Sequence, residues 1–185
     1  MKVKRMKILA LSGSLREASF NTRALHIAQA LAPDGVDVTV VDVAGIPPYR
    51  EEDYAQGFPA AVEALRDAIR EADAVLIATP EYNYSIPGVL KNAIDWVSRP
   101  PEQPFAGKPI AIMGASAGKL GTARAQYHLR QVFVFLDAHL LNKPEVMIGG
   151  AHTLFDARGE LTDEPTREII GELVRSLVDW ANRVG

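Results

Sequence analysis

Hydroxyl, amide and guanidinium groups gather in one short stretch near the start of the chain. Residues 8–21 read ILALSGSLREASFN, in which a Gly/Ser turn separates an apolar run from the start of a helical pattern. The turn carries Ser14, Ser19 and Asn21 as neutral donors and Arg16 as a charged fork that suits phosphate. At such a strand–turn–helix junction, free backbone N–H groups and the helix dipole also attract anions. The stretch therefore predicts a phosphate-binding site.

Two of these residues also have a purely structural interpretation. Ser19 and Asn21 are both residue types that cap helix N-termini, so either one taken alone could serve only as a cap. The combination with Ser14 and Arg16 within eight residues favours a ligand site over a cap.

The turn does not match the common nucleotide-binding motifs. It contains Gly13 but not the G-x-G-x-x-G of dinucleotide folds, and residues 114–120 (GASAGKL) are one residue short of a P-loop and lack its hydroxyl. A hydroxyl-rich turn with one arginine suits a terminal phosphate monoester better than a pyrophosphate. FMN is the leading candidate, and a nucleotide or sugar phosphate is the alternative.

The elements that must position this turn alternate between apolar strands and amphipathic helices. The predicted strands span residues 8–11, 36–43, 74–78, 109–113 and 145–148. The predicted helices span residues 22–31, 59–71, 87–97, 122–136 and 164–183, and the predicted loops include 45–57 and 149–162. The pattern predicts one α/β domain over residues 1–185, a flavodoxin-like three-layer sandwich. Its five-stranded parallel sheet has the order 2-1-3-4-5, with helices on both faces.

In such a fold, ligands gather at the carboxyl ends of the strands. The loop after the third strand reads TPEYNYSIPG (79–88), where prolines stiffen a polar and aromatic segment. The loop after the fourth strand, 114–119, consists mostly of small residues that let backbone approach a flat ligand. Each loop alone could be a tight connection, whereas the three loops together favour a site for a planar heterocycle. The 45–57 loop favours a surface connection over a lid.

Composition excludes several other classes of function. The 185 residues carry a net charge of −3, which argues against a nucleic-acid partner. The absence of cysteine excludes thiolate catalysis, and the four histidines lack metal-ligand spacing, so no metal site is predicted. No stretch reaches membrane-spanning length, and the apolar run after the basic residues 1–5 is too short for a signal peptide. The sequence therefore predicts a cytoplasmic protein with no membrane partner.

The motifs of the first and third loops resemble those of the NADPH-dependent FMN reductase family, closest to its chromate or quinone reductase branch. They are SGSLR (12–16) with Ser19 and Asn21, PEYN (80–83) with Ser85 and PG (87–88), and the downstream LKNAIDW (90–96). The resemblance covers nearly the whole chain and implies an FMN enzyme that uses NADPH or NADH. The cofactor-binding residues that it implies are Ser12, Gly13, Ser14, Arg16, Ser19, Phe20, Asn21, Pro80, Glu81, Tyr82, Asn83 and Ser116.

No catalytic acid, base or nucleophile is predicted, because a flavin carries the hydride chemistry itself. The expected enzyme is a ping-pong oxidoreductase that passes electrons from NAD(P)H to quinones, flavins, azo compounds or metal oxyanions such as chromate. Tyr82 and Arg99 are the candidate substrate-binding residues, although Arg99 could equally complement the end of a helix. The alternative function is a flavodoxin-like electron carrier without NAD(P)H turnover.

Two predicted helices carry more apolar surface than one sheet face requires. The helix at 87–97 contains Leu90, Ile94, Trp96 and Val97. The helix at 122–136 contains Tyr127 and the apolar run 132–136. This excess predicts a homodimer, and the family resemblance implies a homotetramer. Arg124, Tyr127 and Glu145 are polar candidates for the second contact between chains.

Overall fold

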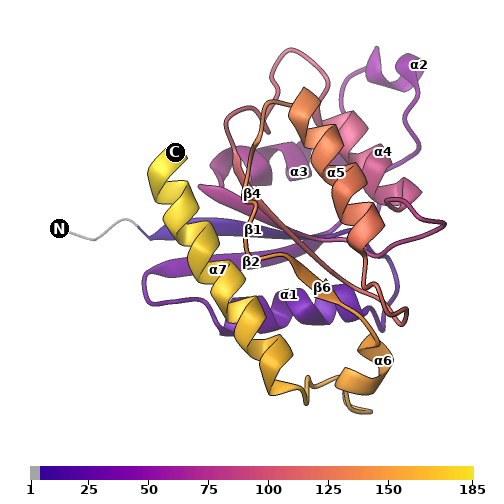
Figure 1. Ribbon diagram of the computed structural model, residues 1–185. Coiled ribbons are helices and arrows are strands. Elements are labelled where there is room, and N and C mark those ends of the chain that lie inside the picture. The colour runs from indigo at the N-terminus through magenta and orange to yellow at the C-terminus, as the bar shows by residue number, and fades with distance from the viewer. Residues whose placement is uncertain (1–4) are drawn as a thin grey trace.

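The computed structural model describes residues 5–185, so residues 1–4 of the N-terminal stretch considered above lie outside the described part. Its strands are β1 (Met6–Ser12), β2 (Val36–Asp42), β3 (Ala74–Ala78), β4 (Pro109–Ala115), β5 (His139–Leu140) and β6 (Val146–Ile148). Its helices are α1 (Phe20–Ala30), α2 (Glu51–Tyr54), α3 (Ala60–Glu71), α4 (Gly88–Val97), α5 (Ala123–Phe135), α6 (Ala151–Leu154) and α7 (Glu164–Val184) (Figure 1). No helix within residues 5–185 has both the length and the apolar content to cross a lipid bilayer.

All strand pairs of the sheet are parallel, and the order β2-β1-β3-β4-β5 confirms the predicted flavodoxin-like topology. The fifth position differs from the prediction, because two short strands share it. β5 pairs with β4 at Pro109 and Ile110, whereas β6 pairs with β4 over 113–115. Pro144 lies between them and has no N–H to offer a strand ladder, which explains why pairing does not continue.

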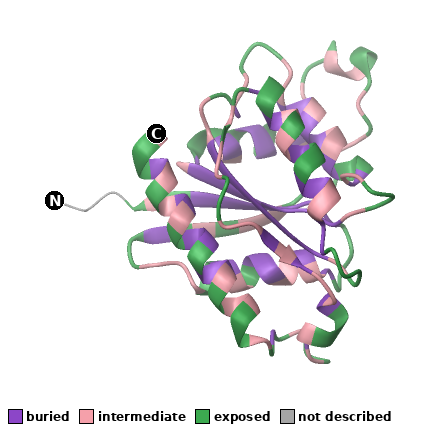
Figure 2. Ribbon diagram, in the orientation of Figure 1, coloured by how far each residue is buried: buried purple, intermediate pink, exposed green. Residues whose placement is uncertain are grey.

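Helices cover both faces of the sheet, with α1 and α7 on one face and α3, α4 and α5 on the other (Figure 1). Successive residues of a strand point to opposite faces. In β1, Ile8 and Ala10 accordingly join the core under α1 and α7, while Leu9 and Leu11 join the core under α3, α4 and α5. Figure 2 shows the central strands β1, β3 and β4 as the most continuously buried part of the chain, as their apolar sequences require.

The two predicted loops each contain a short helix that the sequence pattern did not indicate. α2 lies within the 45–57 segment and α6 within the 149–162 segment. Four residues make barely one helical turn, which is too short to display an apolar period. Both segments therefore look like plain loops in the sequence.

The segment after β2 is packed onto α4. Tyr49, Tyr54 and Phe58 surround the ring of Trp96, with centroid distances of 4.8, 6.5 and 6.5 Å. Trp96 is fully buried, and its Nε1 donates a hydrogen bond of 2.8 Å to the carbonyl oxygen of Pro47. The segment therefore connects β2 to α3 and covers one side of α4.

A matched pair of glycines tests the packing at the carboxyl end of β4. A Cβ at Gly114 would lie 2.4 Å from the carbonyl oxygen of Thr79 and 1.9 Å from Oγ1 of Thr122, whereas a Cβ at Gly88 would meet nothing within 4 Å. We expect Gly114→Ala to lower the free energy of unfolding by about 3 kcal/mol, because backbone atoms must move. Gly88→Ala should change it by less than about 1 kcal/mol. Urea denaturation measures both, and equal stabilities would contradict this packing.

Candidate functional site

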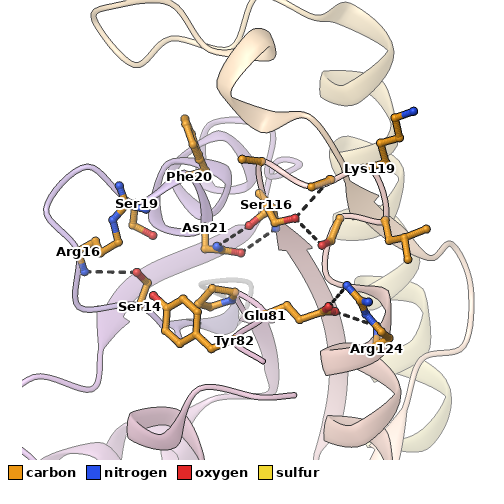
Figure 3. Close-up of a pocket in the computed structure, with 16 residues that line it drawn as sticks. Ser14, Arg16, Ser19, Phe20, Asn21, Glu81, Tyr82, Ser116, Lys119 and Arg124 are labelled. Atoms are coloured by element: carbon orange, nitrogen blue, oxygen red, sulfur yellow. Dashed lines mark hydrogen bonds and ion pairs between the residues drawn. The ribbon is translucent and has the colours of Figure 1, made fainter. Parts of the chain in front are cut away.

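A cavity of about 420 Å³ lies at the carboxyl ends of β1, β3 and β4, where three predicted loops converge (Figure 3). This volume falls within the range of small-molecule and cofactor sites. Its lining residues are Ser14, Arg16, Ser19, Phe20, Asn21, Pro80, Glu81, Tyr82, Ala115, Ser116, Ala117, Gly118, Lys119, Leu120, Gly121 and Arg124. The site thus combines segments that lie about a hundred residues apart in the chain.

Most of the predicted cofactor-binding residues line this cavity. The four predicted site residues that do not line it are Ser12, Gly13, Asn83 and Arg99. Conversely, the cavity includes Leu120, Gly121 and Arg124, which lie outside the three predicted ligand-binding loops. Leu120 and Gly121 directly continue the small-residue loop and could have been found from it, whereas Arg124 belongs to the next helix.

Ser12 and Gly13 support the loop after β1 from its buried side. Ser12 is buried, and its Oγ lies 2.8 Å from Oγ1 of Thr22 and accepts a hydrogen bond of 3.3 Å from the backbone N–H of Ser14. A Cβ on Gly13 would lie only 2.9 Å from Cδ2 of Leu90 in α4. These two residues therefore set the course of the loop and do not face a ligand.

The donors for an anion lie at the opening of α1. Oγ of Ser19 accepts from the backbone N–H of Thr22 at 3.2 Å, which makes Ser19 the N-cap of the helix. Oγ of Ser14 accepts from the N–H of Arg16 at 3.3 Å. In both bonds the serine is the acceptor, so the hydroxyl hydrogen can point to a ligand. The cap interpretation of Ser19 is therefore compatible with ligand binding.

Asn21 ties the first loop to the end of β4. Its Nδ2 donates to the carbonyl oxygen of Ala115 at 2.9 Å, and its Oδ1 accepts from the N–H of Ala115 at 2.8 Å. The side chain is buried, and both of its polar atoms are engaged in this pair. Asn21 therefore borders the cavity as predicted, and its amide positions the backbone of Ala115 there with one of its two Nδ2 hydrogens and its Oδ1.

Glu81 is the one carboxylate among the lining residues, and it caps α5. One of its oxygens accepts from the backbone N–H groups of Arg124 and Ala125, at 3.0 and 3.1 Å. The other oxygen forms an ion pair with the guanidinium of Arg124, as Figure 3 shows. Thr122, the residue before α5, makes no side-chain cap of its own. Glu81 thus fills the N-cap role from a distant loop.

The residues after Glu81 form a strained turn. The N–H of Tyr82 donates to the carbonyl of Ser85, and the N–H of Ser85 to the carbonyl of Tyr82, both at 3.0 Å. The central residues Asn83 and Tyr84 have φ angles of 50° and 68°, which defines a type I′ turn. Asparagine suits such a position, whereas for tyrosine the left-handed backbone is about 1–2 kcal/mol less favourable. The guanidinium of Arg124 lies over the ring of Tyr84, with its Cζ 3.7 Å from the ring centroid. Such an exposed cation–π contact stabilises the turn by about 0.5–1 kcal/mol.

The loop after β4 presents small residues and positive charge. The hydroxyl of Ser116 donates to the carbonyl of Gly121 at 2.5 Å and its N–H to Ile148 at 3.0 Å, so it holds the loop closed. Lys119 is exposed at the rim of the cavity. With Arg16 and Arg124 there are three cations against one carboxylate, and this balance favours an anionic ligand.

Arg99 lies outside this cavity, in a separate groove with Phe135. Its Nε donates to the carbonyl of Asp95 at 2.9 Å, and its guanidinium lies 5.6 Å from the ring centroid of Tyr49. In this chain Arg99 therefore complements the end of α4, which was the alternative interpretation of this residue.

The cavity fits FMN in shape and chemistry. The hydroxyl hydrogens of Ser14 and Ser19, the exposed Arg16 and the N-terminus of α1 are grouped at one end, as a phosphate monoester requires. The other two loops offer backbone, Tyr82 and small side chains, which a flat ring system can approach closely. No single loop meets both requirements.

Comparison with known proteins agrees with this fit. The family model described as NADPH-dependent FMN reductase matches residues 6–153. The chain is 60% identical over 179 residues to an NAD(P)H-dependent FMN reductase of Pseudomonas aeruginosa and 46% identical over 183 residues to a quinone reductase of Escherichia coli. Both alignments cover 97% of each protein. The predicted family resemblance is thereby confirmed.

A solved structure gives the same result. FerB of Paracoccus denitrificans, described as a flavoenzyme NAD(P)H:(acceptor) oxidoreductase, superimposes with a TM-score of 0.88 at 35% identity. The alignment covers 97% of this chain and 99% of FerB. The comparisons confirm the predicted enzyme class, an FMN oxidoreductase that uses NAD(P)H.

Asn21 offers a test of how the two loops are joined. Asn21→Asp keeps the acceptor for the N–H of Ala115 but replaces the donor to its carbonyl with a second acceptor. We expect the free energy of unfolding to fall by about 1–3 kcal/mol, because a buried carbonyl loses its partner, and flavin affinity to fall with it. Asn182→Asp, at an exposed position on α7, is the control. Urea denaturation at neutral pH measures both variants, and a wild-type result for Asn21→Asp would contradict the positioning role.

Proposed function

The chain belongs to the NADPH-dependent FMN reductase family, and we propose that it reduces quinones with NAD(P)H as the electron donor. The observation that carries this proposal is the shared cavity at the ends of β1, β3 and β4. It places a phosphate-type donor set and a flat, small-residue wall in one space. The names of two relatives, the quinone reductase of Escherichia coli and a 2-hydroxy-1,4-benzoquinone reductase of Burkholderia, support the choice of acceptor.

The residues of the chain bind the cofactor and orient it. In the proposed complex, Ser14, Arg16 and Ser19 hold the phosphate, and the loops at 80–82 and 115–118 border the ring system. Bound FMN supplies the redox chemistry, accepting hydride from NAD(P)H and passing electrons to the acceptor. Since the donor and the acceptor must both reach FMN in this cavity, they occupy it in turn, which makes the proposed mechanism ping-pong. Flavins, azo compounds and chromate are further acceptors under the same proposal.

The charge of the cavity disfavours the alternative of an electron carrier. Such a carrier would be expected to show acidic clusters around its flavin. Of the side chains that line the cavity, three are cationic and one is a carboxylate that is already paired with Arg124.

The absence of cysteine and the use of a nicotinamide donor are in keeping with the proposed cytoplasmic location.

We also propose a homodimer that assembles further into a homotetramer. The apolar residues of α4 do not support it, because four of them are buried within the chain: Leu90, Ile94, Trp96 and Val97. The end of α5 does support it, since Val134 and Phe135 are 76% and 87% exposed. The polar candidates have partners within the chain: Arg124 pairs with Glu81, and Tyr127 donates to Glu145 at 2.8 Å. Arg99 neighbours Phe135 in its groove, so this assembly would place Arg99 near a second chain.

The first test concerns the phosphate loop. Arg16→Ala removes a charge-assisted contact of about 1.5–3 kcal/mol, so the affinity of the apoprotein for FMN should fall about tenfold to a hundredfold. Arg175→Ala, at an exposed position on α7 outside the cavity, should leave the affinity unchanged. Flavin fluorescence titration measures both. An Arg16→Ala variant that binds FMN like the wild type would remove this loop from the cofactor site.

The second test concerns the reaction. We expect the protein to purify yellow, NADPH or NADH to bleach its absorption under anaerobic conditions, and a quinone to restore it. The absorbance spectrum after each addition follows both half-reactions separately. A flavin that neither nicotinamide bleaches would exclude the reductase and favour the carrier.

The third test concerns assembly. Light scattering at micromolar concentration should show a dimer or tetramer. Phe135→Lys should shift the distribution towards monomers, because it places a charge in an apolar contact. Glu172→Lys introduces the same side chain at an exposed position of α7 and should leave the mass unchanged. A monomeric wild type would overturn the proposed assembly.

A further inference from the structure

We propose that Phe155 is a positioning residue for the cofactor: its ring holds the ring of Phe20 at the phosphate end of the cavity and so helps the protein to retain FMN. This inference rests on the function proposed above and brings in a residue from outside the cavity. The centroids of the two rings lie 5.3 Å apart and the ring planes are inclined by 34°, so the rings form an aromatic pair. Phe20 lines the cavity, whereas Phe155 does not.

Phe155 belongs to a segment that is bound to the loop after β4. The segment begins with α6, which lies beside the amino end of α1 (Figure 1). The N–H groups of Gly150 and Ala151 donate to the carbonyls of Gly118 and Ser116, at 3.1 and 2.9 Å. Both of these carbonyls belong to residues that line the cavity. The segment is therefore anchored to one wall of the site before it reaches Phe155.

A small hairpin fixes the position of Phe155. Phe155 and Leu161 form an antiparallel bridge. In the turn between them, one carboxylate oxygen of Asp156 accepts from the N–H groups of Arg158 and Glu160, both at 2.9 Å. The side chain of Phe155 is buried, and it joins the core under α1 and α7. The ring is thus held firmly enough to support a second ring.

The same hairpin contacts α1 at a second point. A Cβ at Gly159 would lie 2.5 Å from Cζ of Arg23, so the turn of the hairpin closes directly on this guanidinium. Gly159 has a φ of 86°, a conformation that glycine adopts readily. Phe20 and Arg23 are three residues apart and therefore lie on the same face of α1. The hairpin supports the face of α1 that carries Phe20.

Helix formation does not explain the aromatic residue at the start of α1. Ser19 already caps the helix through its hydroxyl, so the side chain of Phe20 has no capping role. The ring of Phe20 packs on Phe155 and also lines the cavity. A ring beside the phosphate donors excludes water, and charge contacts are stronger where water is excluded. A side chain that is already held loses little freedom when a ligand packs on it. Phe155 therefore contributes to FMN affinity through Phe20.

The test is a double-mutant cycle on the affinity of the apoprotein for FMN, measured by fluorescence titration. Phe155→Leu keeps an apolar side chain but removes the ring pair, and it should weaken FMN binding about three- to tenfold, the range of an aromatic pair. Phe20→Leu should weaken binding as well. The double variant should bind FMN no more weakly than Phe20→Leu, because Phe155 acts through Phe20. Two losses that multiply would overturn the proposal, as would wild-type affinity in Phe155→Leu.

Two further variants separate this role from a general loss of packing. Phe155→Tyr keeps the ring and should bind FMN like the wild type. Leu161→Val removes one methylene from the other member of the bridge, which is buried in the same core. It should lower the thermal midpoint of the apoprotein, as Phe155→Leu does, but leave the affinity for FMN unchanged. Weaker FMN binding in either Phe155→Tyr or Leu161→Val would refute the positioning role.

These titrations involve no turnover, so they are independent of the proposed reaction. If neither nicotinamide bleaches the bound FMN of the wild type, the proposed function fails, and the affinities of the apoprotein variants still decide the role of Phe155. If the wild type reduces quinones but Phe155→Leu binds FMN equally well, only the role of Phe155 is refuted.

Discussion

The pair of hydrogen bonds between the amide of Asn21 and the backbone of Ala115 holds the site together. β1 and β4 are not neighbours in the sheet, because β3 lies between them. The loops that follow β1 and β4 would otherwise be related only through the core. The amide of Asn21 satisfies both the N–H and the carbonyl of the last residue of β4, as a neighbouring strand would. The phosphate-type donors and the small-residue wall thereby become parts of one surface.

A second connection of the same kind joins the remaining loop to α5. Glu81 satisfies two N–H groups that every helix leaves unpaired at its start. Because its carboxylate also pairs with Arg124, the charge that it brings into the cavity is compensated locally. The loops after β1, β3 and β4 are thus joined by side chains that engage backbone groups, and the lining residues depend on these few connections for their positions.

Much of the fold was predictable, because buried parallel strands such as 74–78 are uniformly apolar and leave little doubt about their position. The phosphate-type loop was predictable for a similar reason, since its donors are close together in the sequence. Local patterns did not reveal that Asn21 pairs with Ala115 or that Glu81 caps a helix 43 residues away. Both contacts are set by the tertiary structure. The division of the last strand position into β5 and β6 likewise depends on which atoms of β4 each segment reaches.

The aromatic packing on α4 has an optical consequence. The chain has two tryptophans, and they lie on opposite faces of the sheet. Trp96 is sealed beneath Tyr49 and its neighbours, whereas Trp180 on α7 is partly exposed and donates to the carbonyl of His139 at 2.8 Å. Their emission therefore comes from environments of different polarity. The protein carries two intrinsic fluorophores, one in each helical layer, so the loosening of either layer can be followed by tryptophan fluorescence without a label.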